Sequence, residues 1–260
     1  MLSSEGRTGW PVRRPVSEVL EPRRIMKAQP GLERALSFIS CQLQPAGKGQ
    51  VSRDEGARRR AVTISRQTGS GAHTVAEKLA ALLQAHNPKE ACPWTVFDRN
   101  LVEKVLADHD LPERVGRFMP EDRISSISDT MEELFGLHPP SWMLVRKVSE
   151  TILHLLELGN VIVIGRGATV LSAKLEHVFH VRLVGSLEKR VQHVQELDHL
   201  GEEAALRIIR REDRGRRRYL KRYFKTDLDD PLLYHLVINT DLVSYDEAAR
   251  IIAEAVLRRS

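Results

Sequence analysis

The amino-acid sequence predicts a three-layer α/β fold, with a parallel sheet of about five strands and helices on both faces. Short apolar runs alternate with amphipathic helices, as in β-α units. The run Val161-Ile162-Val163-Ile164 is apolar throughout, as expected for a strand buried on both faces. The five runs begin at Ala61, Trp94, Val161, Val178 and Leu236, and several end in glycine or charged residues. Open parallel sheets bind ligands at that end of their strands.

Composition indicates a protein with one medium-sized core. The chain has 260 residues, 42% of them hydrophobic. No apolar run approaches the ~20 residues of a membrane span, and the N-terminus lacks the apolar segment of a secretory signal. Cys41 and Cys92 are isolated, without CxxC spacing, which favours a reduced cytoplasm.

Charge separates the N-terminal region from the body. Residues 1–60 hold 12 Lys and Arg against 6 Asp and Glu, and residues 61–260 hold 28 against 29. The near-neutral body argues against nucleic-acid binding. We expect a disordered leader over residues 1–29, a short helix and linker over 30–60, and one domain over 61–260. The helix, Leu32–Leu43, has an apolar stripe that would dock on the body or on a partner.

The stretch Ala61–Leu83 reads as a buried strand, a glycine loop and an amphipathic helix. Such a unit aims backbone N–H groups and a helix N-terminus at one point, where a phosphate can sit. The match to G-x-x-x-x-G-K-[ST] is partial. If Gly71 is the second glycine, the first falls on Arg66, the lysine on Ala72 and the hydroxyl on His73, with Thr74 one place later. The alternative is a plain turn without a ligand.

Two further strand ends carry polar clusters. Asp98-Arg99-Asn100 follows the second strand, and Gly165-Arg166-Gly167 follows the third. An arginine between glycines at the end of a buried strand is placed to meet an anion, although a solvent-facing turn would look the same.

The remaining pattern is helical. Residues 110–145, broken by four prolines, form either a lid or acceptor-binding lobe or an ordinary helical packing insert. A helix over Val148–Leu158 ends at Gly159-Asn160, and Ser186 caps another.

Residues 207–225 contain ten Lys and Arg, which fits a solvated face, a nucleic-acid patch or a mobile lid over a polyphosphate. After a capping box at Ser244–Glu247, the last helix is expected to bury its apolar stripe, Ala248, Ile251, Ile252, Ala255 and Val256.

Five stretches, in this order, resemble the cytidylate kinase-like family, a branch of the P-loop nucleoside monophosphate kinases. They are TISRQTGSGAHTVAEKLA, VFDRNLVEKV, VIVIGRGATVL, EDRGRRRYLKRYF and LVINTDLVSYDEAA. The resemblance implies a P-loop kinase fold with an arginine-rich helical lid over 204–226. It also implies a kinase that uses ATP with Mg²⁺, and a nucleoside monophosphate or similar small phosphorylated acceptor.

The glycine loop, the strand ends and the resemblance together give the candidate site residues. The cofactor-binding set is Arg66, Gln67, Thr68, Gly69, Ser70, Gly71, Ala72, His73 and Thr74. The acceptor set is Asp98, Arg99, Gly165 and Arg166, and the Mg²⁺ set is Ser70, Thr74 and Asp98. The catalytic set is Arg66, Arg166, Asp213, Arg214, Arg216 and Arg217.

The sequence departs from the family pattern in three places. Ala72 replaces the loop lysine, and Gly167 stands where cytidylate kinases have an aspartate that contacts the nucleoside. The acceptor-side tyrosine and arginine expected after Asp98 are not recognisable. A catalytically weak or inactive nucleotide-binding regulator is therefore the alternative to a kinase, and the acceptor and oligomeric state stay open.

Overall fold

The structure is a computed structural model that describes residues 37–38, 40–41, 59–88, 92–102, 121–135 and 142–259. For residues 121–126 and 135 it describes the backbone alone. The predicted leader over 1–29 lies outside these ranges, as do most of 30–60 and residues 110–120 and 136–141 of the predicted insert.

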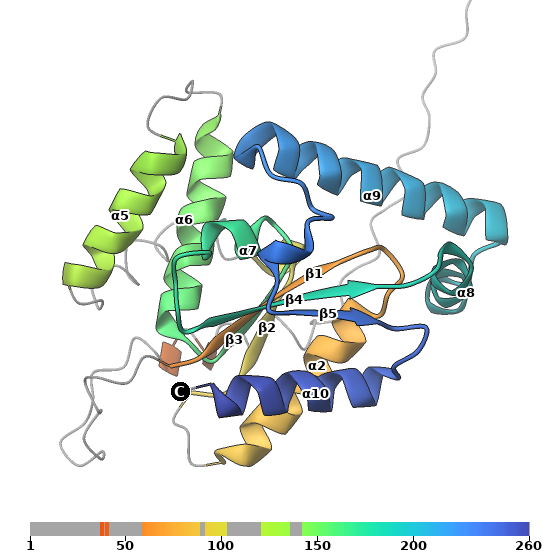
Figure 1. Ribbon diagram of the computed structural model, residues 1–260, viewed down its shortest axis with the longest axis horizontal. Helices are drawn as coiled ribbons and strands as arrows, with labels where there is room; N and C mark the ends of the chain where they lie inside the picture. Colours follow the sequence, from red (N-terminus) through yellow and green to blue (C-terminus); the bar gives the residue numbers. More distant parts are fainter. Residues whose placement is uncertain are drawn as a thin grey trace, which may run out of the picture.

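A parallel sheet forms the middle layer (Figure 1). Its strands in the described part of the chain are β1 (Ala61–Arg66), β2 (Thr95–Phe97), β3 (Val161–Ile164), β4 (Val178–Val184) and β5 (Leu236–Asn239). Their order is β2-β3-β1-β4-β5, and each neighbouring pair is parallel. The predicted α/β class with a five-stranded parallel sheet is confirmed. β1 is the middle strand, with β3 beside it.

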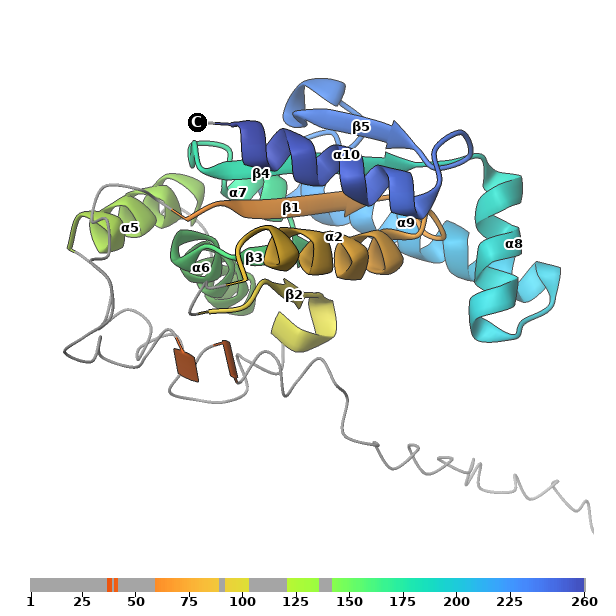
Figure 2. The ribbon, with the colours of Figure 1, turned by 90° about the horizontal axis from the view of Figure 1, so that it is seen from below.

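Helices cover both faces of the sheet (Figure 2). On one face α2 (Ala72–His86) packs beside α10 (Tyr245–Arg258). On the other lie α6 (Met143–Leu158) and the short α7 (Ala168–Leu171), with α5 (Glu121–Phe135) against α6. Two apolar clusters fill the two interfaces, and β1 contributes to both of them.

Two helices lie near the carboxyl ends of the strands. α8 (Leu187–Asp198) follows β4, and the long α9 (Glu202–Phe224) returns along the sheet toward α7 (Figure 1). Leu220 and Phe224 join the α6-side core, which fixes the second half of α9. A short 3₁₀ turn, η2 (Pro231–Leu233), then leads to β5. This path carries the arginine-rich segment across the edge of the sheet where ligands bind in such folds.

Helix ends follow the sequence signals. Gly159 ends α6 with φ 73°, in the region that glycine favours. The hydroxyl of Ser186 accepts a hydrogen bond from the Lys189 N–H, and that of Ser244 accepts one from Glu247. α6 begins at Met143, earlier than the predicted Val148.

The predicted buried face of α10 is wrong at Ile251. Ile251 is 37% exposed, whereas the fully buried positions are Ala248, Ala249, Ile252, Ala253 and Val256. Ala249 and Ala253, which the predicted stripe did not include, move the centre of the buried face away from residue 251. Hydrophobicity alone predicted that the large side chain of Ile251 would be buried. Close packing against α2 instead buries the small alanine side chains.

The interpretation of Cys41 and Cys92 as isolated thiols is also wrong. A disulfide joins them across 51 residues, which removes the ground for inferring a reduced compartment. Beside it Phe38 is fully buried and packs edge-to-face on Phe97 of β2, with ring centroids 5.8 Å apart. The described residues of this N-terminal segment thus dock on the body. In the described part of the chain, no helix is both long and apolar enough for a membrane span.

Candidate active site

The loop between β1 and α2 requires glycine at two positions. Gly69 has φ 85° and Gly71 has φ 76°, both in the left-handed region. A β-carbon on Gly69 would lie 2.5 Å from the Arg190 carbonyl oxygen, and one on Gly71 would lie 2.3 Å from the ring of Tyr245. The loop therefore passes in close contact between the starts of α8 and α10.

Two loop side chains hold the backbone in place. The hydroxyl of Ser70 donates to the carbonyl of Gln67 at 2.8 Å and approaches that of Leu183 at 3.3 Å. The amide oxygen of Gln67 accepts the Gly185 N–H at 3.0 Å. Ser70 is 1% exposed, so its hydroxyl points into the protein, away from the predicted Mg²⁺ site.

Arg66, the last residue of β1, reaches across the end of β3. Its Nη1 would lie 1.7 Å from a β-carbon on Gly165, so glycine is needed there for the guanidinium to pass. Burial and the nearby Arg216 lower the pKa of Arg66 to about 10, although Asp98 acts in the opposite direction. The side chain is still a cation at neutral pH, and its surroundings favour an added anion.

The β3–α7 turn has an unusual backbone. Gly165, Arg166 and Gly167 all have positive φ, at 79°, 56° and 76°. A non-glycine residue in this region is uncommon, and such conformations persist where the surrounding structure enforces them, often at functional sites. Burial, together with the neighbouring Arg99, lowers the pKa of Arg166. The turn thus holds Arg166 at the carboxyl edge beside Arg99.

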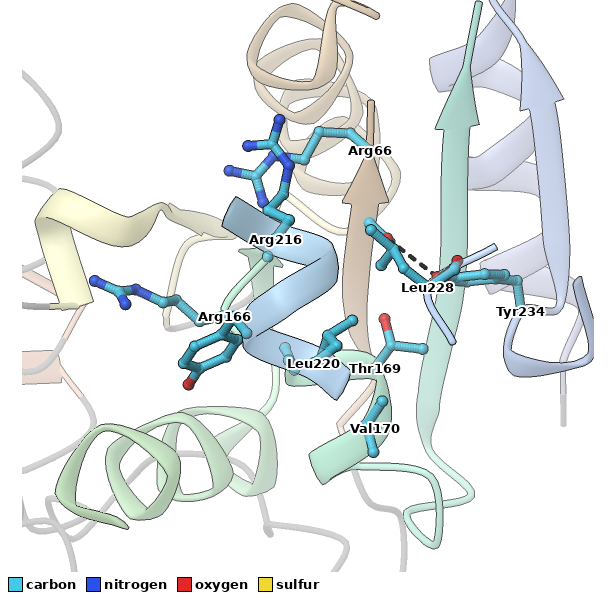
Figure 3. A pocket seen from close by; sticks show the side chains of 13 residues that line it. Arg66, Arg166, Thr169, Val170, Arg216, Leu220, Leu228 and Tyr234 are labelled. Carbon is cyan, nitrogen blue, oxygen red and sulfur yellow. Dashed lines mark hydrogen bonds between the residues drawn. The ribbon is translucent and has the colours of Figure 1, made fainter. Parts of the chain in front are cut away.

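Arg66, Arg166 and Arg216 line one pocket between the sheet and α9 (Figure 3). The pocket is narrow, with a cavity volume of about 40 Å³, and it is partly open to solvent. The guanidiniums of Arg66 and Arg216 lie together, whereas Arg166 projects from the turn on its own side (Figure 3). The rest of the lining combines hydroxyl and apolar groups, from Ser65, Thr169, Tyr219, Tyr234, Val170, Leu220 and Leu228. Burial raises the pKa of Tyr219 to about 12, so its hydroxyl keeps its proton.

Asp213 of α9 lies against the glycine loop. Its Oδ1 accepts the N–H and the hydroxyl of Thr68, each at 2.8 Å. Nη1 of Arg190 donates to Oδ2 at 2.8 Å, and Nη2 of Arg216 donates to Oδ1 at 2.8 Å. Burial alone would raise the pKa of Asp213, but these bonds from Thr68, Arg190 and Arg216 hold it below its usual value.

A model of the cytidylate kinase-like family matches residues 61–242. The chain belongs to the cytidylate kinase-like family. A comparison with curated proteins found no match.

A solved structure supports the fold of this family member. A crystal structure of an uncharacterized protein from Eubacterium ventriosum ATCC 27560 is similar, with a TM-score of 0.59 and 21% identity. It covers 78% of this chain and 100% of that one. TT1252 from Thermus thermophilus matches with a TM-score of 0.38 and 15% identity over 78% of this chain and 100% of that one.

Asp98 and His73, predicted for the acceptor and cofactor sets, lie near each other. Oδ1 of Asp98 accepts the Leu101 N–H at 2.8 Å, which starts the next helix. Oδ2 lies 3.6 Å from Nε2 of His73, on the first turn of α2. Thr74 follows on the same turn and is half-buried. Asp98 therefore faces the start of α2, so the end of β2 lies close to the helix that follows the glycine loop.

Two of the predicted lid arginines lie elsewhere. Arg217 donates from Nε to Asp229 at 3.0 Å and does not line the pocket, and Arg214 is exposed. Of the arginines predicted on α9, only Arg216 lines the pocket. A helix turns by about 100° per residue, so neighbouring positions face different directions.

Arg190 was missed in the sequence. Its side chain is 10% exposed, and it donates to the Gly185 carbonyl at 3.0 Å and the Thr68 carbonyl at 3.1 Å, besides Asp213. Its position offered a signal, because it lies on the first turn of a helix that begins directly after a predicted parallel strand. A cation there lies at the carboxyl edge.

Proposed function

We propose that this protein is an ATP-dependent phosphotransferase that acts on a nucleoside monophosphate or a similar small phosphorylated acceptor. The observation that carries the proposal is the shared pocket of Arg66, Arg166 and Arg216, which come from β1, the β3–α7 turn and α9. Phosphoryl transfer requires positioning and charge neutralisation more than covalent chemistry. A site with several guanidiniums beside a glycine loop supplies both.

The donor would bind at the loop. The N-terminus of α2 and the loop N–H groups attract phosphate oxygens. Arg66 would take the place of the lysine that Ala72 replaces, because its guanidinium already lies beside that of Arg216. Arginine binds phosphate through two parallel N–H bonds, which also fixes the orientation of the phosphate.

The acceptor phosphate would bind Arg166. The backbone of the turn fixes this side chain, and Arg99 adds a second positive charge next to it. Asp98 would contact the remainder of the acceptor. The donor pair Arg66 and Arg216 and the acceptor pair Arg166 and Arg99 would thus flank the transferred group.

Mg²⁺ is the expected partner of ATP. Among the described residues no group of three or more His, Cys, Asp or Glu could hold a metal by itself. This agrees with Mg²⁺ chemistry, since Mg²⁺ is bound by one or two protein oxygens, substrate phosphates and waters. Asp98 and Thr74 would hold it, and the bound ion would supply charge neutralisation at the phosphates. Ser70 does not fit, because its hydroxyl contacts backbone carbonyls.

A nucleotide-binding regulator is the second candidate. It is favoured by Ala72 in the lysine position and by Asp213, which lies in contact with the loop. A strong transition-state donor is worth about 10²–10³ in rate. If Arg66 does not replace the lysine, binding would survive and turnover would not.

The test is ATP turnover against nucleoside monophosphates, deoxynucleotides and phosphorylated non-nucleotide acceptors, with Mg²⁺. An acceptor that raises ADP release well above the acceptor-free rate would support the kinase. ATP binding without turnover for any acceptor would support the regulator. The absence of both would contradict both candidates and leave the glycine loop as a turn.

A further inference from the structure

The position beside Thr68 is built to hold an anion. Its donors are the Thr68 N–H, the Thr68 hydroxyl, Nη1 of Arg190 and Nη2 of Arg216. All four contacts are 2.8 Å long. Backbone N–H groups, a hydroxyl and guanidiniums are the donors that proteins use for phosphate oxygens.

The anion in this position belongs to the chain itself. The carboxylate of Asp213 comes from α9, 145 residues after Thr68, and its side chain is 17% exposed. Both of its oxygens are engaged, Oδ1 by Thr68 and Arg216 and Oδ2 by Arg190. A phosphate oxygen and this carboxylate therefore compete for the same N–H group.

We propose that Asp213 occupies the loop position of a donor phosphate, and that a polyphosphate must displace it before binding. The inference rests on the proposed phosphate-binding role of the loop, and it adds that the Asp213 carboxylate fills the phosphate position when no ligand is bound. α9 then acts as an internal competitor. Its contact with the loop holds the site closed in the absence of ligand, and a polyphosphate releases Asp213 from Thr68.

Arg190 is the cation that stays when Asp213 leaves. It donates hydrogen bonds to the carbonyl of Gly185, just after β4, and to that of Thr68 in the glycine loop, and these bonds do not involve α9. Arg216 also contacts the Thr68 hydroxyl but lies on α9, so its position relative to the loop depends on that helix, whereas the position of Arg190 does not. We infer that Arg190 binds the incoming phosphate alongside Arg66 in a loop without lysine.

A purely structural role makes a different prediction. If Asp213 only pins the loop, its loss would disorder the phosphate-binding backbone and weaken polyphosphate binding. If it is a competitor, its loss makes binding tighter, because the apparent dissociation constant scales inversely with the open fraction. The sign of the change separates the two roles.

The experiment compares Asp213→Asn with Glu212→Gln as a matched control. Glu212 is the preceding residue on α9, with the same charge and ion pairs to Arg211 and Arg216 at 3.6 and 3.8 Å. In the described structure it makes no hydrogen bond to the loop. Dissociation constants for ATP and inorganic tripolyphosphate are measured by calorimetry at fixed ionic strength. We expect Asp213→Asn to bind both about tenfold more tightly, and Glu212→Gln to stay within about twofold of the wild type.

Three outcomes would overturn the proposal. Unchanged or weaker binding by Asp213→Asn, with measurable binding by the wild type, would refute the competitor and leave the proposed function intact. Equal tightening in both variants would show a general effect of net charge. No binding by any protein would refute the competitor and the phosphate-binding loop together. Circular dichroism checks folding, and Asp213→Ser is the second variant if the amide does not fold.

Discussion

The side chain of Arg66 packs directly against the backbone of Gly165, in space that a side chain on residue 165 would occupy. The guanidinium of Arg66 crosses the end of β3, where a β-carbon on residue 165 would lie 1.7 Å from Nη1. The glycine that ends β3 therefore positions a cation that begins at the end of β1. Two strands that pair in parallel thus build one half of the proposed donor site together.

Gly165→Ala tests this match. The substitution introduces a side chain at φ 79° and displaces the Arg66 guanidinium. We expect a loss of about 1–3 kcal/mol in the free energy of unfolding from backbone strain, and weaker ATP binding. Gly215→Ala is the control, since a β-carbon there would meet no atom within 4 Å beyond its chain neighbours and the nearby backbone of helix α9. That variant should gain about 0.5–1 kcal/mol. Equal stability of the two variants in urea unfolding would contradict the match.

Gly167 stands where cytidylate kinases carry an aspartate, and Phe224 of α9 fills the space that such a side chain would need. A β-carbon there would lie 2.9 Å from the ring of Phe224, and φ is 76°. We expect Gly167→Asp to lower thermal stability and to create no activity toward CMP, because α9 fills the space. A stable Gly167→Asp protein that phosphorylates CMP faster than the wild type would show that Phe224 moves aside.

The strands, the glycine loop and the fold class follow from the sequence because they depend on local patterns. Apolar runs such as Val161–Ile164 and the Gly69–Gly71 turn carry their structural requirement in their own residues. Contacts between distant segments leave no such pattern. The Cys41–Cys92 bond and the Asp213–Thr68 contact join residues far apart in the chain, and only the fold shows them.

The same distinction between local patterns and long-range contacts holds for the candidate site. Arg66 and Arg166 could be found because each ends a predicted strand, and both line the pocket. Arg214, Arg216 and Arg217 could not be told apart, since only the rotation of α9 decides which of them faces the pocket. The contact of Arg190 with the glycine loop could be recognised only once the structure placed the start of α8 beside that loop.

Acid should destabilise the protein through His180. Burial, with His235 and Arg259 nearby, lowers the pKa of His180 to about 4, while Nδ1 lies 2.8 Å from the Thr63 hydroxyl. The unfolded chain binds this proton near pH 6.5 and the folded protein only near pH 4. Stability is therefore complete above pH 6.5 and is lost as the pH falls toward 4, by about 3 kcal/mol for this group.

Urea unfolding between pH 4 and 7.5 measures this effect. His180→Gln should flatten the pH dependence, whereas His199→Gln should keep it, because His199 lies at the exposed end of α8. A slope that persists in His180→Gln would assign the proton uptake to another group.

Arg166 should act on the acceptor. Its place beside Arg99 predicts that Arg166→Ala raises KM for the acceptor and lowers kcat, with little change in ATP affinity. Arg207→Ala is the control, because Arg207 is exposed and pairs with Glu203 on the same helix. Steady-state kinetics with each substrate varied in turn separates the two effects. A folded Arg166→Ala protein with full turnover would remove Arg166 from the site.

The central claim is that Arg66 replaces the missing loop lysine as a cation for the transferred phosphate. The most direct test is kcat/KM for ATP in the wild type, Arg66→Ala and the control Arg207→Ala, with the best acceptor from the panel. We predict a loss of about 10²–10³ in Arg66→Ala and less than about twofold in Arg207→Ala. Full turnover by a folded Arg66→Ala protein would contradict the account.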